Sequence, residues 1–481
     1  MRFPQGKIQR SVEKLKGITQ YFSCEHLSRK IQMKGPLPST KEVYQRALHI
    51  AWPSAAESVL VSLVSSVDTI MVGGLGPAAI AAVGLTNQPK FILLALIMSL
   101  NVGVTTVVAR RKGQENREGA QKCLRMALMI TFFLSLFLSI LGFLFAEPIM
   151  KFSGAQPDVM ADSVAYFRII MVGFVPMCIG LTINAAQRGV GNTRISMTTN
   201  ITSNIINLIF NYLLIHGNFG FPRLEVKGAA LATILGSTVA CLLSIRSVLP
   251  HDTYLHLSFR VPWKFEKETL SSIWIISSSA VVEQLFMRFG FFTYVQVVAN
   301  LGTVAFATHQ ICMNIINLSF AFGDGFSIAI ASLVGQSLGA KRPDLAKLYV
   351  KVNKVLLYGI SGVLSVLFVV FRYQLVGLFT TDSAIIAEAG NLMLIIAATT
   401  VIQTSALSYT GCLRGAGDAK YIAKTAFISI AIVRPLSAWI LCYPVGWGLV
   451  GAWLSLFLDQ CLRCVLNGTR FRKGKWAEIE L

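Results

Sequence analysis

Long apolar runs, each close to twenty residues, alternate with short polar segments along almost the whole chain. The hydrocarbon core of a bilayer is about 30 Å thick and needs about 20 apolar residues per helix, so each run predicts a membrane-spanning helix. We count twelve runs, at residues 47–73, 90–109, 123–146, 164–186, 196–215, 228–249, 270–298, 305–333, 349–372, 386–410, 421–443 and 446–466. The pattern predicts an all-α membrane protein with twelve transmembrane helices.

The two halves of the chain share motifs at one constant spacing of 226 residues. The pairs are Glu57 with Glu283, Leu75 with Leu301, Gly113 with Gly339, and residues 188–192 (RGVGN) with 414–418 (RGAGD). An even number of spans in each half gives both halves the same orientation. We therefore expect two six-helix lobes related by a pseudo-twofold axis along the membrane normal, with the substrate site between them.

The repeat also divides the chain into segments. The expected divisions are a basic tail (1–46), an N-lobe (47–249), a linker (250–269), a C-lobe (270–466) and a C-terminal segment (467–481). Met33 offers an internal start site, so residues 1–32 are assigned no role.

Charged residues make up only 14% of the chain, against about 25% in soluble domains, and the net charge is +20. This scarcity excludes a soluble enzyme, and the long charge-free runs exclude a nucleic-acid-binding protein. Most Lys and Arg fall in segments on the side of the two termini. The opposite loops hold five, namely Lys90, Lys151, Arg223, Lys227 and Arg372. The positive-inside rule predicts a multi-pass protein of the cell membrane with both termini in the cytoplasm, and the linker with them.

Ionisable residues in a span cost about 2.5–3.5 kcal/mol on insertion scales, so the few that occur are candidates for function. Asp68 lies in the first span. Asn200, Asn204, Asn207 and Asn211 follow one another at i, i+4, i+7 and i+11 and share one face of the fifth span. A carboxyl group facing several carboxamides suits binding of Na⁺ or H⁺. We predict a cation-binding site here, and the alternative is that the Asn residues only join helices.

The second half has its own polar candidates. Glu283 lies in the seventh span with Arg288 five residues further on, a poor helical spacing for an ion pair. Asp324 lies between two glycines and suggests a hydrated break in the eighth span. Arg434 and Asp459 are expected to neutralise each other.

Two other in-span residues carry structural expectations. His309 is expected at the membrane interface, hydrogen-bonded. Pro53 interrupts the first span and predicts a kink there, either static or a hinge.

Four segments resemble motifs of the multidrug and toxic compound extrusion (MATE) family. They are residues 67–73 (VDTIMVG), 188–193 (RGVGNT), 334–340 (VGQSLGA) and 413–418 (LRGAGD). The resemblance covers about residues 45–465 and implies two six-helix lobes. It also implies that Asp68 is the cation-coupling aspartate, that Asn207 and Asn211 surround it, and that Pro53 is the hinge at which the helix bends.

In the C-lobe, Glu283 resembles a glutamate of the NorM-type branch of this family. Gln403, however, stands where that branch carries a second carboxylate. This departure resembles the DinF-type or Gram-positive branch more closely. Glu283, Gln403 and Asp324 remain the candidates for a substrate or cation site in the C-lobe.

The resemblance implies a secondary exporter that antiports cationic amphipathic drugs and toxic compounds against inward H⁺ or Na⁺ by alternating access. We expect no enzymatic activity, because GxxxxGK[ST], HExxH and DDxxD patterns are absent from the sequence. We expect no cofactor beyond the coupling ion, held by Asp68 if it is Na⁺. We also expect a monomer in the lipid bilayer, with small organic substrates and no nucleic acid.

Two alternatives stay open. One is a dedicated natural-product exporter. The other is a lipid-linked saccharide flippase on a related fold, which would line its cavity with arginines to hold pyrophosphate. The predicted spans hold only Arg288 and Arg434 as strong in-span cations, which disfavours the flippase.

Overall fold

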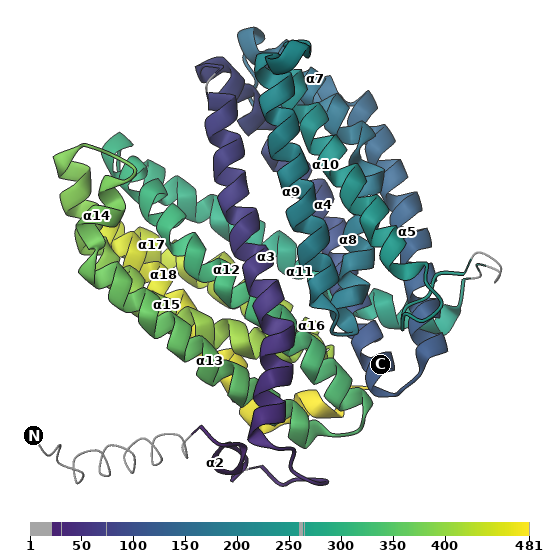
Figure 1. The fold of residues 1–481 in the computed structure, drawn as a ribbon. Coiled ribbons are helices and arrows are strands. Elements are labelled where there is room, and N and C mark those ends of the chain that lie inside the picture. Colours follow the sequence, from purple (N-terminus) through teal and green to yellow (C-terminus); the bar gives the residue numbers. More distant parts are fainter. Residues whose placement is uncertain (1–21, 30, 74, 259–262, 264, 481) are drawn as a thin grey trace, which may run out of the picture.

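The computed structural model describes residues 22–29, 31–73, 75–258, 263 and 265–480, and helices dominate them (Figure 1). The first half holds α2 (Cys24–Ser28), α3 (Thr40–Gly73), α4 (Pro77–Gly113), α5 (Arg117–Leu144), α6 (Ala146–Phe152), α7 (Pro157–Val172), α8 (Phe174–Gly189), α9 (Thr193–His216), the short η1 (Asn218–Gly220) and α10 (Glu225–Val248). The second half holds α11 (Lys267–Ala299), α12 (Thr303–Gly339), α13 (Pro343–Val370), α14 (Arg372–Gly377), α15 (Ser383–Ala416), α16 (Ala419–Ala426), the π-helical η2 (Phe427–Val433), α17 (Arg434–Cys442), α18 (Gly448–Lys473) and η3 (Lys475–Glu478).

Ten helices in this part of the chain are long and apolar enough to cross a membrane. The pair α7 and α8, bent by 50° at Gly173, supplies an eleventh span. The predicted fifth span, residues 196–215, corresponds to α9, which packs against α3 and α10 in the first lobe and carries the asparagines. The all-α, two-lobe architecture expected from the repeat is confirmed.

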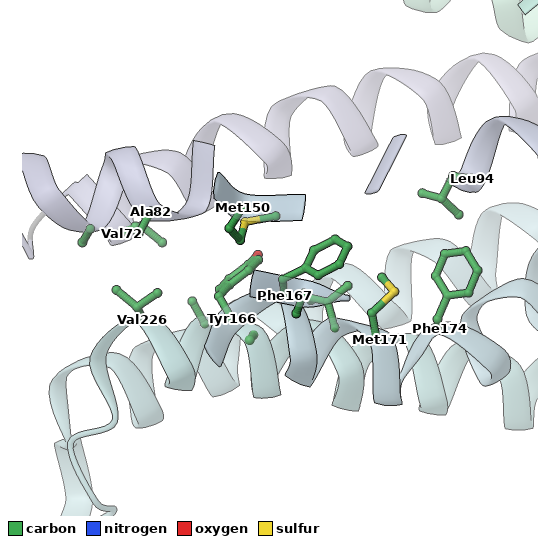
Figure 2. Close-up of a cluster of buried hydrophobic side chains, with 14 of the residues drawn as sticks. Val72, Ala82, Leu94, Met150, Tyr166, Phe167, Met171, Phe174 and Val226 are labelled. Carbon is green, nitrogen blue, oxygen red and sulfur yellow. The ribbon is translucent and has the colours of Figure 1, made fainter. Parts of the chain in front are cut away.

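Each lobe has a hydrophobic core of its own. The first core joins α4, α7, α8 and α10, and Figure 2 shows Tyr166, Phe167 and Met171 on one side of it and Leu94 on the other. The second core surrounds Trp453 of α18, which is fully buried. The lobes come together at the end of the molecule that carries α2 and diverge at the other end (Figure 1).

The lobes meet tightly at what we call the closed end, where the last turns of α4 and α12 cross. A Cβ atom added to Gly113 would collide with the backbone carbonyl of Gln336. A Cβ atom added to Gly339 would collide in the same way with the carbonyl of Arg110. The two contacts are equivalent under the repeat, because Gly339 lies 226 positions after Gly113 and Gln336 lies 226 positions after Arg110. The glycines repeated in the sequence are therefore the points at which the two helix backbones touch.

Hydrogen bonds across the closed end follow the same pseudo-symmetry. Ser332 Oγ of α12 donates to the carbonyl oxygen of Arg188 over 2.7 Å. Thr106 Oγ1 of α4 donates to the carbonyl oxygen of Arg414 over 3.0 Å. Each half of the chain thus caps the other half's helix end with one hydroxyl group.

The C-terminal segment adds a strap to the closed end. Trp476 of η3 is fully buried in the second lobe. Three residues further on, the carbonyl oxygen of Ile479 accepts a hydrogen bond from the Arg110 guanidinium of the first lobe over 2.8 Å. The last described residues therefore connect the two lobes.

We expect Gly339→Ala to destabilise the folded protein by about 1–3 kcal/mol, the usual cost of overpacking, because the new methyl group separates α4 from α12. Gly359→Ala in α13 is the matched control, since a Cβ atom there would meet nothing within 4 Å. Alanine favours a helix over glycine, so the control should not lower stability. Thermal unfolding of the two purified variants measures the difference, and equal Tm values would contradict the close crossing.

Two helix limits differ from the sequence prediction. The second span starts at Pro77 instead of residue 90, so Lys90 lies inside α4 and not in a loop. The predicted hydrated break at Asp324 is wrong, because α12 runs as one helix from Thr303 to Gly339. Residues 1–21 of the predicted basic tail lie outside the described residues.

Candidate functional site

The helix that carries the candidate coupling residue is shared between the lobes. The first half of α3 packs Val43, Ala47 and Ala55 against Phe326 and Leu333 of the second lobe. The second half of α3 reaches the first lobe's core through Val72.

Pro53, which is buried inside α3, lies just before the point where the helix leaves the second lobe. Gly325 of α12 is packed directly against the backbone of Ser54 and Ala55. A bend at Pro53 stays a prediction, and this contact places it at the boundary between the lobes.

Asp68 lies in the second half of α3 and faces α9. Asn211 Nδ2 donates to Asp68 Oδ1 over 2.8 Å. The amide orientation of an asparagine is assigned from its hydrogen-bond partners. For Asn207 the orientation that satisfies both ends directs its nitrogen to Asp68 Oδ1 and Oδ2, at 2.8 and 3.1 Å. The two buried amides thus bind the carboxylate as predicted from their spacing on α9.

The amide oxygens of Asn207 and Asn211 differ in their hydrogen bonding. That of Asn207 accepts from Thr233 Oγ1 of α10 over 3.3 Å. Asn211 Oδ1 is buried and has no hydrogen-bond partner among the described residues. Rotation of either amide would turn an oxygen towards the carboxylate, so the same three residues can present donors to a charged Asp68 or oxygens to a cation.

A cavity of about 140 Å³ lies beside this network, between α4, α7, α8 and α10. Thr233 and Ser237 supply polar atoms, and Ile170, Met177 and Ile234 supply apolar walls. Lys90 also lines it, and its positive charge acts on the Asp68 carboxylate. Lys90 was not predicted as a site residue, because the polar stretch before it, which contains Pro89, is typical of a loop.

Two of the asparagines on α9 do not join the Asp68 site. Asn200 Nδ2 makes a short hydrogen bond to Glu57 Oε1, which also accepts from Ser196 Oγ over 3.0 Å. Asn204 Nδ2 is buried without a partner in the described part of the chain. Of the four asparagines on this face of α9, Asn207 and Asn211 bind Asp68, and Asn200 and the predicted site residue Asn204 do not.

An ion pair between α3 and the end of α8 recurs in the second lobe. Arg188 Nη1 lies 3.5 Å from Glu57 Oε1, and Arg414 Nη2 lies 2.6 Å from Glu283 Oε1. Both members of the pair are repeated at the spacing of 226 residues, which is a signal that the sequence alone contained. Glu283 is therefore bound to Arg414 and not to its neighbour Arg288.

The other two C-lobe candidates, Asp324 and Gln403, do not take part in the ion pair of Glu283 and Arg414. Asp324 is exposed on α12 and makes no salt bridge in the residues described, although the charges of Arg414 and Glu283 act on it. Gln403 of α15 is completely buried, and neither its oxygen nor its nitrogen has a hydrogen-bond partner among those residues. The structure therefore does not gather Glu283, Asp324 and Gln403 into one hydrogen-bonded site.

The predicted pair in the last two spans is structural. Arg434 of α17 forms a salt bridge with Asp459 of α18, as expected from the sequence, and both side chains are fully buried. His309 lies six residues after the start of α12, and its Nδ1 has no hydrogen-bond partner among the described residues. It is buried in the C-lobe core, with its ring 5.6 Å from that of Tyr294 and 5.5 Å from that of Trp453.

Comparison with known proteins finds the duplication directly. The family model MatE matches the chain twice, over residues 53–213 and 279–440, which together exceed half its length. The starts of the two matches are 226 residues apart, the spacing of the repeated motifs. The chain belongs to the MatE family.

Relatives of this family align with nearly the whole chain. A transporter named YisQ from Bacillus subtilis is 28% identical over 454 residues, which cover 93% of this chain and 97% of the relative. A probable multidrug resistance protein NorM from Thermotoga maritima is 26% identical over 443 residues, with 92% and 95% covered.

Solved structures of MATE proteins share the fold. One in complex with MaD3S gives a TM-score of 0.85 at 21% identity, covering 91% of this chain and 97% of its own. An outward-facing MATE transporter gives 0.84 at 21% identity, covering 90% and 97%. These similarities confirm the two-lobe fold typical of the MatE family.

Proposed function

We propose that this MatE-family chain is a secondary active exporter of amphipathic organic compounds, driven by inward movement of H⁺ or Na⁺ through the Asp68 site. The observation that carries the proposal is the carboxylate of Asp68 bound by the rotatable amides of Asn207 and Asn211 inside a membrane lobe. The names of the NorM relatives, which describe multidrug resistance, support the export of drugs.

The transport cycle follows from the shared helix. A cation that binds at Asp68 changes the charge on the second half of α3, while the first half of α3 stays packed on the other lobe. Ion binding and substrate binding then favour different arrangements of the lobes, and each lowers the affinity for the other. The closed end would face the cytoplasm in the arrangement described here.

Cationic compounds suit the exposed carboxylate of Asp324, which lies on α12 without a salt-bridge partner in the described residues. The single chain, with one lobe on each side of the substrate, would be the complete transport unit in the cell membrane. The chain's own residues supply the coupling, so the exporter needs only the ion as a co-substrate.

The test is dye efflux from vesicles that contain the purified full chain. Ethidium is loaded, and a Na⁺ gradient or a pH gradient is imposed separately. We expect one of the two gradients to drive ethidium movement, and an ionophore that collapses that gradient should stop it. Protein-free vesicles control for leakage. If neither gradient moves the dye, the antiport proposal is wrong.

A further inference from the structure

Lys354 of α13 lies inside a predicted span, residues 349–372, between two tyrosines of the second lobe. Its Nζ donates to Tyr409 Oη of α15 over 2.7 Å and lies 4.3 Å from the centroid of that ring. It also lies 5.3 Å from the ring centroid of Tyr358, which is exposed. Tyrosine carries no negative charge near neutral pH, so these contacts hold the ammonium group without neutralising it.

A second basic residue approaches this position from α18. The ring of Tyr409 packs on Gly468, where an added Cβ atom would lie only 3.1 Å from the ring. Arg472 follows Gly468 by one helical turn, and helical side chains lean towards the N-terminal end of their helix, which here is towards Tyr409. The charges of Lys354 and Arg472 both act on the thiol of Cys464, which lies on the same face of α18. The two basic residues therefore share one site on the second lobe.

Lys347 extends this site towards the closed end. It precedes Lys354 by seven residues, which places both on one face of α13. Its Nζ lies 3.8 Å from the position of a Cβ atom added to Gly474, the residue that caps α18. We call Lys347, Lys354 and Arg472 the basic cluster. It connects the closed-end parts of α13 and α18, and α15 contacts both of these helices (Figure 1).

The basic cluster has no counter-charge in the described part of the chain, where none of its three members forms a salt bridge. The neighbouring acids are already bound. Asp344 lies 2.7 Å from Arg342 Nη2, and Asp418 lies 2.7 Å from Arg470 Nε. A basic residue inside a span is costly without a partner. Like charges at one site repel one another, and an anionic group between them would accept charge-assisted hydrogen bonds.

Exposed apolar side chains continue from the basic cluster away from the closed end. They are Val363 and Val366 on α13, and Leu458 and Val465 on α18. Each lies further from the closed end than the cluster does, because α13 begins there and α18 ends there. Exposed apolar residues of a membrane span face the acyl chains of lipids. The surface thus has a positive part at headgroup level and an apolar part beyond it.

We propose that the basic cluster binds the phosphate of an anionic phospholipid in the leaflet at the closed end. The phosphate oxygens accept from Lys354 and Arg472, and the acyl chains lie along the exposed apolar residues. Basic residues grouped beside the spans are typical of anionic-lipid recognition. The continuous apolar surface favours a lipid over free phosphate. The site belongs to the second lobe and Asp68 to the first, so this inference does not depend on the coupling ion.

The test measures lipid binding to the purified full chain by native mass spectrometry. Dioleoyl phosphatidylglycerol and dioleoyl phosphatidylcholine have the same acyl chains, so a difference in affinity reports the net charge of the headgroup. We expect the unaltered protein to bind phosphatidylglycerol about tenfold more tightly than phosphatidylcholine. An equimolar amount of inorganic phosphate should not displace the lipid, because free phosphate lacks the apolar contacts.

Arg472→Gln should lower the affinity for phosphatidylglycerol about fivefold, the effect of one basic residue near a membrane surface, and should leave the affinity for phosphatidylcholine unchanged. Lys354→Gln should act in the same direction, and Lys354→Arg should keep most of the affinity. Lys420→Gln is the matched control, because Lys420 is an exposed basic residue of α16 at the same end of the second lobe. Arg472 is exposed, so its variant is expected to fold and to decide the question even if Lys354→Gln does not fold.

Several outcomes would overturn the inference. They are equal binding of the two lipids or binding of neither by the unaltered protein, displacement of phosphatidylglycerol by inorganic phosphate, and an unchanged affinity in a folded Arg472→Gln protein. An equal loss in Lys420→Gln and Arg472→Gln would show a general effect of positive charge and would also contradict a defined site.

Discussion

Replacing Asp68 by Asn should abolish ion-driven export and leave the protein folded. Asparagine has nearly the same shape as aspartate and can still hydrogen-bond to Asn207 and Asn211, so the packing of α3 on α9 should survive. It cannot gain or lose a charge, however, and an exchanger needs a group whose charge changes when the ion binds. We therefore expect ethidium efflux under either gradient to fall to the level of protein-free vesicles.

Asp162→Asn is the control for Asp68→Asn, because Asp162 is an exposed carboxylate on α7 outside the Asp68 network. Both variants should elute as the unaltered protein does and should unfold at similar temperatures. Gradient-driven efflux by a folded Asp68→Asn protein would refute the coupling role.

The largest loss of stability is expected at the buried pair in the C-lobe. Asp459 is fully buried, accepts from Arg434, and lies 3.3 Å from Arg463 Nη2 as well. Asp459→Leu leaves these guanidinium groups without their counter-charge. Breaking such a pair on one side costs about 3–5 kcal/mol. We expect a large decrease in Tm, measured by thermal unfolding of the purified variant.

A second substitution separates charge from packing at this pair. Arg434→Met combined with Asp459→Leu removes both main charges and should recover much of the lost stability, because well-packed apolar residues can replace a buried ion pair. Glu118→Gln is the control at an exposed pair, where Lys122 Nζ lies 3.1 Å from Glu118 Oε1. Its effect on Tm should be close to zero, because both side chains of this pair reach solvent. A double variant no more stable than Asp459→Leu alone would contradict a purely electrostatic cause.

Hydropathy and the repeat predicted the fold because a bilayer forces every span to be apolar and of a minimum length. Hydropathy did not predict the helix limits correctly where a helix is surrounded by other helices of its lobe and not by lipid. In α4 the polar stretch before Lys90 continues the helix, since neighbouring helices of the first lobe pack around it and Pro89 is accommodated. In α9 three of the asparagines bind other side chains of the protein. Hydropathy values cannot tell such a buried face from a face exposed to lipid.

The candidate site was predictable where one helix face determined it. The spacing of Asn207 and Asn211 on α9 indicated that both amides can reach one carboxylate, and Asp68 is bound by both. Arg414 was not predicted as the partner of Glu283, because Arg288 was the one basic residue considered, and its five-residue spacing is poor for an ion pair. Reading the repeat as paired residues would have indicated Arg414, since its counterpart Arg188 faces Glu57.

The two hydroxyl groups that bridge the lobes at the closed end have a consequence for the energy of a transport cycle. Ser332 and Thr106 donate to backbone carbonyls at helix ends, where water can replace each donor as soon as the lobes separate. Exchanging such a bond for water costs only about 1 kcal/mol. The fully buried pair of Arg434 and Asp459, by contrast, lies within one lobe and need not open. The hydrogen bonds of Ser332 and Thr106, which would break in every cycle, are thus replaced by water at a small free-energy cost. The ion pair of Arg434 and Asp459 would stay intact while its lobe moves as a unit.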